Sequence, residues 1–195
     1  MPFPPISWWA AVLGAETLYL DAHEHFEKMS YRNRYYISGS NGRIQLSVPL
    51  VHGRDQRAPM HDVQISNEQI WQVQHWRTLV SVYRRSPYFD YYEDSLREIF
   101  ESGFNHLTHF NLTTIDWVKQ QLKLPIEIES TETYIKDLRG LKPAAEKKLI
   151  QEQLTYYQVF ADRTGFLPNL SILDLLFSEG PYTVQWIKEN MRNNH

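Results

Sequence analysis

The sequence predicts an α+β or mixed α/β fold, in which an N-terminal sheet rich in β-hairpins forms a single layer covered by three to five helices. Two patterns lead to this class. In the first third of the chain, apolar and polar residues alternate with the period of two that strands have. From residue 70 onward, apolar side chains recur at spacings of three and four, as in amphipathic helices. With 195 residues, 42% of them hydrophobic, the chain is predicted to be a single domain over residues 1–195 with a sizeable core.

The first third supplies the predicted strands. Residues 17–28 contain one alternating stretch and residues 31–38 another. Residues 40–43 read Ser-Asn-Gly-Arg, for which we predict a type I′ turn, since that turn needs positive φ at both of its central residues. The return strand covers residues 44–51. After a polar loop, we predict a further short strand over residues 60–65.

A first helix is predicted to begin at a capping box. Ser66 and Gln69 have the required spacing, and Ile65 and Ile70 suit a hydrophobic staple. This helix should end near Arg84. Its predicted buried stripe consists of Ile70, Val73, Trp76, Val80 and Tyr83.

Two further helices follow. Ser86 and Pro87 suit the N-cap and the first position of a helix that ends near Gly103. Asn105 is predicted to cap the next helix. Its apolar side is formed by Leu107, Phe110, Thr114, Val118 and Leu122.

The last third is more irregular. Residues 125–130 and 156–160 have strand-like patterns. Between them, residues 131–153 mix both charges with few aromatics, and we expect a flexible or helical insertion. Ser171, with Asp174 three residues later, caps a short helix. A final helix should run to about Met191.

Composition excludes several classes of protein. The 20 Lys and Arg against 23 Asp and Glu leave a formal net charge of -3, so we expect no nucleic-acid partner. The absence of cysteine excludes disulfide scaffolds, thiolate zinc sites and a cysteine nucleophile. Phosphate-binding glycine loops, serine-hydrolase elbows and HExxH are all missing from the sequence. No long apolar run predicts a membrane span, and the first residues do not resemble a signal peptide, so we expect a cytoplasmic protein.

Two histidines suggest one candidate metal site. On a strand, His23 and His25 would share a face and could bind one metal ion. The alternative is a pair of half-exposed histidines on an edge strand. The residues that could supply a third ligand are Glu27, His61, Asp62 and His75.

A second candidate is the segment Lys28-x-x-Tyr31-x-Asn33-Arg34. It places hydrogen-bonding side chains and a guanidinium near the start of a strand, where Arg34 could hold a carboxylate or a phosphate in bidentate fashion. The alternative is an ordinary exposed strand face.

Trp71, His75 and Thr78 form a third candidate, because they lie on one side of the first predicted helix. A histidine beside a tryptophan can act as a general base. The alternative is a core histidine bonded to a backbone carbonyl.

The corner between the first two helices is a fourth candidate. A helix that begins after Ser86 would offer free N–H groups to an anionic ligand such as a sugar phosphate, with Tyr83 and Tyr88 alongside. The alternative is a capped corner packed by aromatics.

These motifs, taken in order, resemble the WbqC-like family. The ordered set is Pro4-Pro5-Ile6-Ser7-Trp8-Trp9, Lys28-x-x-Tyr31-x-Asn33-Arg34, Leu46-Ser47-Val48-Pro49, Trp71-x-x-x-His75-Trp76, Tyr83-x-x-Ser86-Pro87-Tyr88-Phe89, Leu107-x-x-Phe110-Asn111 and residues 166–177. Members of this family occur in gene clusters for O-antigen, the glycan of lipopolysaccharide. The resemblance therefore implies bacterial surface-polysaccharide biosynthesis, with transfer of glycine or another acyl group to an amino sugar as the suggested reaction.

Our leading hypothesis is such an acyl or aminoacyl transferase. His75 would deprotonate the attacking amine, while Arg34 and Asn33 would hold the donor or stabilise the oxyanion. The small-molecule substrate, an amino sugar or an acyl donor, would be bound by Lys28, Tyr31, Trp71, Tyr83, Ser86 and Tyr88. Two alternatives remain open, a non-catalytic module that binds a sugar, an anion or a partner, and a metal-dependent hydrolase built on His23 and His25. Neither a cofactor nor an oligomeric state follows from the residues.

Overall fold

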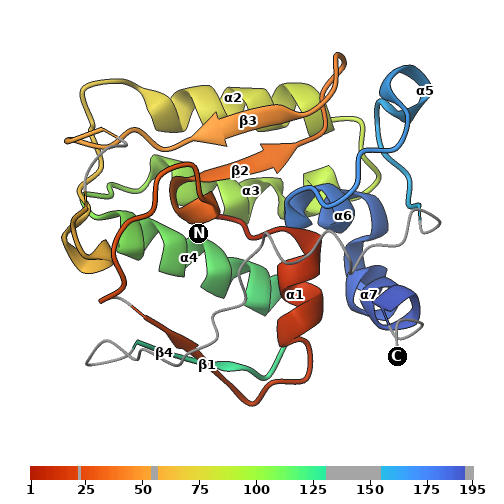
Figure 1. The fold of residues 1–195 in the computed structure, drawn as a ribbon. Coiled ribbons are helices and arrows are strands. Elements are labelled where there is room, and N and C mark those ends of the chain that lie inside the picture. Colours follow the sequence, from red (N-terminus) through yellow and green to blue (C-terminus); the bar gives the residue numbers. More distant parts are fainter. Residues whose placement is uncertain (22, 54–56, 131–154, 192–195) are drawn as a thin grey trace.

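The fold combines helices with short strands, which confirms the α+β prediction (Figure 1). The structure is a computed structural model that describes residues 1–21, 23–53, 57–130 and 155–191. The strands are β1 (Thr17–Leu20), β2 (Arg34–Ile37), β3 (Ile44–Ser47) and β4 (Glu127–Ser130). The helices are α1 (Ile6–Val12), α2 (Trp71–Tyr83), α3 (Phe89–Glu101), α4 (Leu107–Gln121), α5 (Ala161–Thr164), α6 (Ile172–Glu179) and α7 (Thr183–Met191), with short 3₁₀ turns η1 (Tyr31–Asn33), η2 (Met60–Asp62) and η4 (Gly180–Tyr182).

The predicted hairpin is present as the antiparallel pair β2–β3, with Ile37 opposite Ile44. It lies along α2 (Figure 1). Because successive strand residues point to opposite faces, Tyr35 and Ile37 are buried against the helices while Arg34 and Tyr36 face outward. The hairpin therefore has an inner face that belongs to the core and an outer face that remains partly accessible.

The predicted type I′ turn is wrong in its geometry. Gly42 has a φ of 109°, but Asn41 is not among the described residues with positive φ. The N–H of Gly42 donates to the carbonyl of Gly39, which closes the turn one residue earlier than expected. The connection between Ile37 and Ile44 is consequently longer than a two-residue loop and needs only one left-handed residue.

The other two strands form a separate parallel pair, in which Leu18 lies opposite Ile128. Figure 1 places this pair at the bottom, apart from the hairpin. The described strands thus make two small sheets instead of the single layer expected. The predicted strand over residues 17–28 ends at Leu20, and His25 makes only an isolated bridge with Pro59.

Two predicted strands contain 3₁₀ turns. The strand expected over residues 31–38 begins with η1, whose N-cap Ser30 accepts a hydrogen bond from the N–H of Arg32. The strand expected over residues 60–65 begins with η2, and only the isolated bridges of Gln64 and Ile65 follow.

Helix α2 is present, but its buried face differs from the predicted stripe. Ile70 is 64% exposed and Val73 is 40% exposed. The capping box is also wrong, because the helix begins at Trp71 with Ile70 at the N-cap and no side-chain cap. The side chains buried on α2 are Trp71, His75, Leu79, Val82 and Tyr83.

The next two helices start later than predicted. Tyr88, not Ser86, occupies the N-cap position of α3, and His106, not Asn105, that of α4. Neither end has a side-chain cap. The apolar side predicted for α4 is confirmed, since Leu107, Phe110, Thr114, Val118 and Leu122 are all buried.

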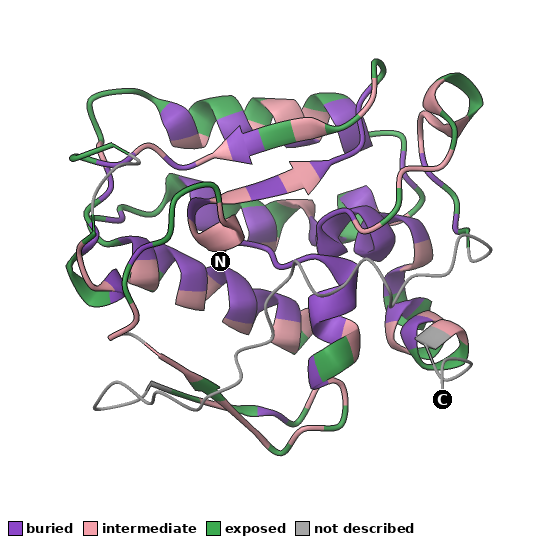
Figure 2. Ribbon diagram, viewed as in Figure 1, coloured by how far each residue is buried: buried purple, intermediate pink, exposed green. Residues whose placement is uncertain are grey.

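The C-terminal helices close the core. Ser171 caps α6 as predicted, by accepting from the N–H of Leu173. The predicted share of Asp174 in this cap is wrong, because its carboxylate accepts from Tyr83, Tyr156 and Gln158 instead. Residues 172–178 are all buried, because α6 contacts α1, α3 and α7 (Figure 2). Residues 156–160 do not form the predicted strand.

The N-terminal segment is fixed by residues from the far end of the chain. Helix α1, which the sequence patterns did not indicate, follows directly on this segment. The N–H of Ile6 donates to the carbonyl of Leu170, and the N–H of Ile172 donates to the carbonyl of Pro4.

The insertion predicted over residues 131–153 lies outside the described residues, and the single-domain assignment stays a prediction.

Candidate functional site

Trp71 and His75 lie in the core beneath the hairpin and do not line an open cleft. They are 2% and 4% exposed. The Nδ1 atom of His75 is 3.2 Å from the hydroxyl of Tyr35, and the indole of Trp71 donates to Asn67. Burial lowers the pKa of His75 to about 4, against a hydrogen bond with the backbone of Ser47 that raises it. The alternative of a satisfied core histidine therefore agrees with this geometry.

The helix corner is also packed. Tyr83 is 1% exposed, and its hydroxyl donates to a carboxylate oxygen of Asp174. Ser86 is buried, and its hydroxyl has no partner among the described residues. Tyr88 is half-buried, with its ring where a side chain on Gly180 would lie. This corner agrees with the alternative of an interhelical contact better than with an anion site.

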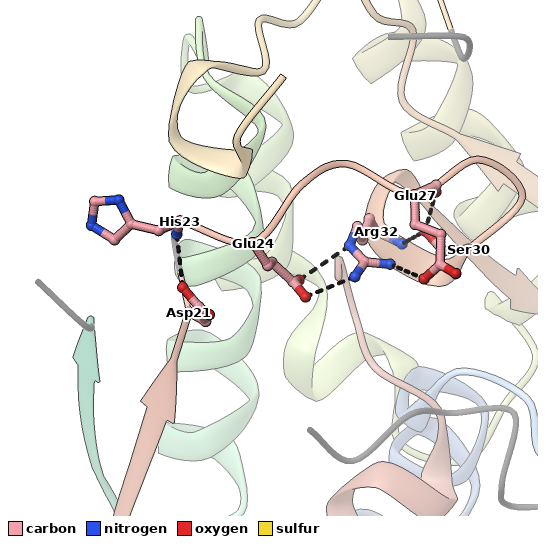
Figure 3. Close-up of polar contacts among 6 residues, drawn as sticks. All are labelled: Asp21, His23, Glu24, Glu27, Ser30 and Arg32. Atoms are coloured by element: carbon pink, nitrogen blue, oxygen red, sulfur yellow. Dashed lines mark hydrogen bonds and ion pairs between the residues drawn. The ribbon is translucent and has the colours of Figure 1, made fainter. Parts of the chain in front are cut away.

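The segment before β2 is held by Arg32. Its guanidinium makes a bidentate contact with Glu24, at 2.7 and 3.1 Å, and a third hydrogen bond to Glu27 at 2.8 Å. Figure 3 shows Arg32 between the two carboxylates. Charge-assisted bonds of this kind are stronger than neutral ones, so Arg32 fixes the loop that carries Lys28 and Tyr31.

On the solvent side of the hairpin, five polar and aromatic side chains lie together, and we call this group the outer face. Tyr31 packs edge-on to Tyr36 at a centroid distance of 5.4 Å, and the guanidinium of Arg43 lies over the Tyr36 ring at 5.4 Å. The amide oxygen of Gln45 accepts from the hydroxyl of Tyr36 at 3.0 Å and, at 3.4 Å, from Arg34. The outer face consists of Tyr31, Arg34, Tyr36, Arg43 and Gln45.

Arg34 is the least satisfied member of this group. Its Nε is buried with no hydrogen-bond partner, and its guanidinium makes no ion pair in the part of the chain that the structure describes. A buried donor without an acceptor is costly, and a carboxylate or phosphate would satisfy it. These features make Arg34 the candidate anion-binding residue of this group.

Asn33 lies behind the outer face, and it has a counterpart that the sequence patterns did not single out. The amide N–H₂ of Asn33 donates to the carbonyl of Val48, and that of Asn111 donates to the carbonyl of Arg32. Both amide oxygens are buried with no donor among the described residues. Since the backbone carbonyls fix the orientation of both amides, the two oxygens remain as unused acceptors.

The two histidines predicted to bind a metal are not adjacent on a strand. His23 packs against His61, with ring centroids 4.9 Å apart, while His25 is exposed beside Pro59. In Figure 3 the ring of His23 points away from Glu24 and Arg32. No group of three or more possible ligands occurs within the described ranges. The geometry thus gives no support to the hydrolase hypothesis.

A buried polar cluster in the C-terminal third also escaped the sequence patterns. Asp174 accepts hydrogen bonds from Tyr83, from Tyr156 at 2.7 Å and from Gln158 at 3.0 Å. Burial raises the pKa of Asp174, against the opposing effect of these hydrogen bonds. The sequence analysis placed Asp174 in the first turn of this helix as a partner in the Ser171 cap, and no pattern indicated its contacts with Tyr83 and Tyr156.

The predicted site residues therefore divide into two groups. Tyr31 and Arg34 lie on the accessible outer face, with Asn33 buried behind it, and Lys28 is exposed in the preceding loop. Trp71, His75, Tyr83 and Ser86 belong to the core, and Tyr88 is half-buried against Gly180. Arg34 and His75 are separated by the hairpin, because Tyr35 between them points inward. The outer face combines the unpartnered Nε of Arg34 with two tyrosine rings, and it is the best candidate for a functional site.

Comparison with known proteins agrees with the motifs. Among the described residues no helix is long and apolar enough to cross a bilayer. No curated protein and no solved structure matches the chain. The model of one family, described as the WbqC-like protein family, matches residues 1–152. Because that match covers more than half of the sequence, and includes β2, β3 and α2, the chain belongs to the WbqC-like protein family.

Proposed function

We propose that the protein is a transferase of bacterial surface-polysaccharide biosynthesis that binds an anionic donor on the outer face. The reaction we favour joins an acyl or aminoacyl group to an amino sugar. The observation that carries the proposal is Arg34, whose buried Nε has no acceptor among the described residues.

The chemistry of the outer face supports an anionic donor. Arg34 and Arg43 supply two guanidinium groups, and no carboxylate belongs to the group. Gln45 and Tyr36 are neutral, so they do not cancel this positive charge. A donor with a carboxylate or phosphate and a planar group would pair with Arg34 and pack against the tyrosine rings.

His75 is better suited to a positioning role than to proton transfer. A general base must reach the proton that it removes, and a pKa of about 4 makes imidazole a weak base at pH 7. We therefore infer that His75 holds Tyr35, and with it the hairpin, in place. The base would then come from the substrate or from a residue other than His75.

Titration calorimetry with uridine diphosphate sugars, acyl-coenzyme A and pyrophosphate tests the donor site. Arg34→Gln should weaken binding of the best ligand at least tenfold, since one charge-assisted bidentate contact is removed. Arg84→Gln is the control, because Arg84 is exposed at the end of α2. Equal dissociation constants for the two variants would contradict the proposal.

A binding module without turnover is the second candidate. It is favoured by the composition of the outer face, whose five residues include no histidine and no carboxylate. The two functions are separated by incubating the protein with a bound donor and glucosamine and analysing the mixture by mass spectrometry. Binding without a new amide product would favour the module.

A further inference from the structure

An open groove runs between α3 and α4, with Ile128 of β4 at its edge. Its volume is about 640 Å³, within the range of small-molecule sites. None of its lining residues belongs to the hairpin, so the groove is separate from the outer face.

The lining excludes anionic and purely apolar ligands. Hydroxyls, carboxamides and carboxylates line the groove, and no lysine or arginine does. An anion would meet repulsion from Glu98, whose carboxylate has no cationic partner among the described residues, and an acyl chain would leave the polar groups without partners. The remaining classes are neutral or cationic ligands that form many hydrogen bonds.

Two polar side chains on opposite walls of the groove have no hydrogen-bond or ion-pair partner among the described residues. Asp116 already contacts Lys119 at 3.2 Å and accepts from Gln120 at 2.7 Å. By contrast, the carboxylate of Glu98 on α3 and the amide of Gln121 on α4 make no hydrogen bond or ion pair with any described residue. Glu98 thus offers one negative charge, and Gln121 offers both donors and an acceptor.

The groove also has apolar surface between these polar groups. Ile99, Leu112 and Ile128 contribute aliphatic atoms, and the indole of Trp117 is anchored by a hydrogen bond to Ser95 at 3.2 Å. The C–H faces of a saturated ring pack on such surface, while hydroxyls at its rim reach Thr113 and Gln121.

We infer that this groove binds a polyhydroxylated amine the size of an amino sugar, with its ammonium at Glu98, its hydroxyls at Gln121 and Thr113 and its ring against Ile99 and Leu112. The site is independent of the donor site on the outer face. It gives the protein a contact with an amine-bearing glycan that does not involve the outer face.

Two-dimensional ¹H–¹⁵N spectra of the full chain test this site, with glucosamine, N-acetylglucosamine and glucose as probes. Glucosamine should shift the indole N–H signal of Trp117, assigned with Trp117→Phe, and the side-chain amide of Gln121. Because an exposed charge pair contributes little, glucosamine should bind only about two- to fivefold tighter than N-acetylglucosamine.

The matched variants are Glu98→Gln and Glu101→Gln. Glu98→Gln should remove the preference for the free amine, whereas Glu101→Gln should keep it, since Glu101 lies on the same helix, contacts Arg97 and does not line the groove. Equal binding of all three probes, an equal effect of both variants, or no shift at Trp117 and Gln121 would overturn the inference. Arg34→Gln should leave this binding unchanged, so a failure here is distinct from a failure of the donor site.

Discussion

At the residue scale, Asp174 connects three parts of the chain that are distant in sequence. Its carboxylate accepts hydrogen bonds from Tyr83 of α2 and from Tyr156 and Gln158 in the segment before α5. The amide of Gln158 also exchanges hydrogen bonds with the backbone of Leu167. The cluster is fully paired, so it stabilises the fold only while every member is present.

Asp174→Asn should lower the free energy of unfolding by about 3 kcal/mol, because the neutral amide accepts fewer hydrogen bonds and turns donors toward the tyrosine hydroxyls. Urea denaturation measures the change. Asp162→Asn is the control and should stay within about 0.5 kcal/mol, since Asp162 is exposed. A similar loss in both variants would remove the special role of Asp174.

His75 predicts a dependence of stability on pH. Its pKa in the folded protein, about 4, is below the ordinary 6.5, so the unfolded chain takes up the proton first. The contribution of neutral His75 to the free energy of unfolding is complete above pH 6.5. It is lost as the pH falls toward 4, by about 3 kcal/mol in total. The difference in unfolding free energy between wild type and His75→Gln should therefore shrink on acidification from pH 7 to 4.5.

The control for this pH effect is His106→Gln. His106 is exposed, so its variant should follow the wild-type profile. If the difference between wild type and His75→Gln stays constant over the same range, His75 is not buried in its neutral form.

The sequence could predict only those site contacts that are local. Tyr31, Asn33 and Arg34 are close in the chain, and the strand period already places Arg34 and Tyr35 on opposite faces. The contact between Tyr83 and Asp174 spans 91 positions, so no local pattern shows it. Burial by such distant partners is what turned the predicted cleft residues into core residues.

At the element scale, α2 shows why helix existence is easier to predict than helix orientation. Apolar residues lie on more than one side of α2, so Ile70 and Val73 formed a stripe as plausible as the one that includes Leu79. The hairpin selects the buried face of α2, because the ring of His75 packs against Tyr35 of the hairpin and against Trp71. Spacing alone does not contain that information.

The orientation of α2 can be tested with two truncations. Leu79→Ala should cost about 3 kcal/mol, since Leu79 is 0% exposed, while Ile70→Ala should cost less than about 1 kcal/mol, since Ile70 is 64% exposed. Chemical denaturation compares them. The reverse ranking would restore the stripe predicted from the sequence.

The hairpin turn provides a second test at this scale. Gly42→Ala should destabilise the protein by about 1 kcal/mol, because φ of 109° is unfavourable for a residue with a Cβ. Ser40→Ala, in the same exposed turn, should have almost no effect. Thermal unfolding compares the two variants. Equal midpoints would show that the positive φ at residue 42 does not require glycine.

At the scale of the whole molecule, the buried hydrophobic residues form one core, whose members extend along the sequence from Phe3 to Ile187. The family match ends at residue 152, yet α6 beyond it is central to this core. The fully buried side chains of α6 include Leu173, Leu175 and Phe177.

A chain that ends at residue 152 should therefore lack a cooperative unfolding transition. It loses α6 and the acceptor of the Tyr83 hydroxyl, which leaves apolar surface of α1 and α3 exposed. Near-ultraviolet circular dichroism and urea denaturation would show this. A sharp transition in the shortened chain would mean that residues 155–191 are an addition to a core that is already complete.

The pairing of residues 4–6 with residues 170–172 has a consequence for biosynthesis. Leu170 is translated 164 residues after Ile6, so the hydrogen bond between them forms long after Ile6 has left the ribosome. Phe3, in contrast, can meet its aromatic neighbours Tyr35 and Phe100 much earlier. The backbone of residues 4–6 should accordingly reach its final position only after residue 172 has emerged.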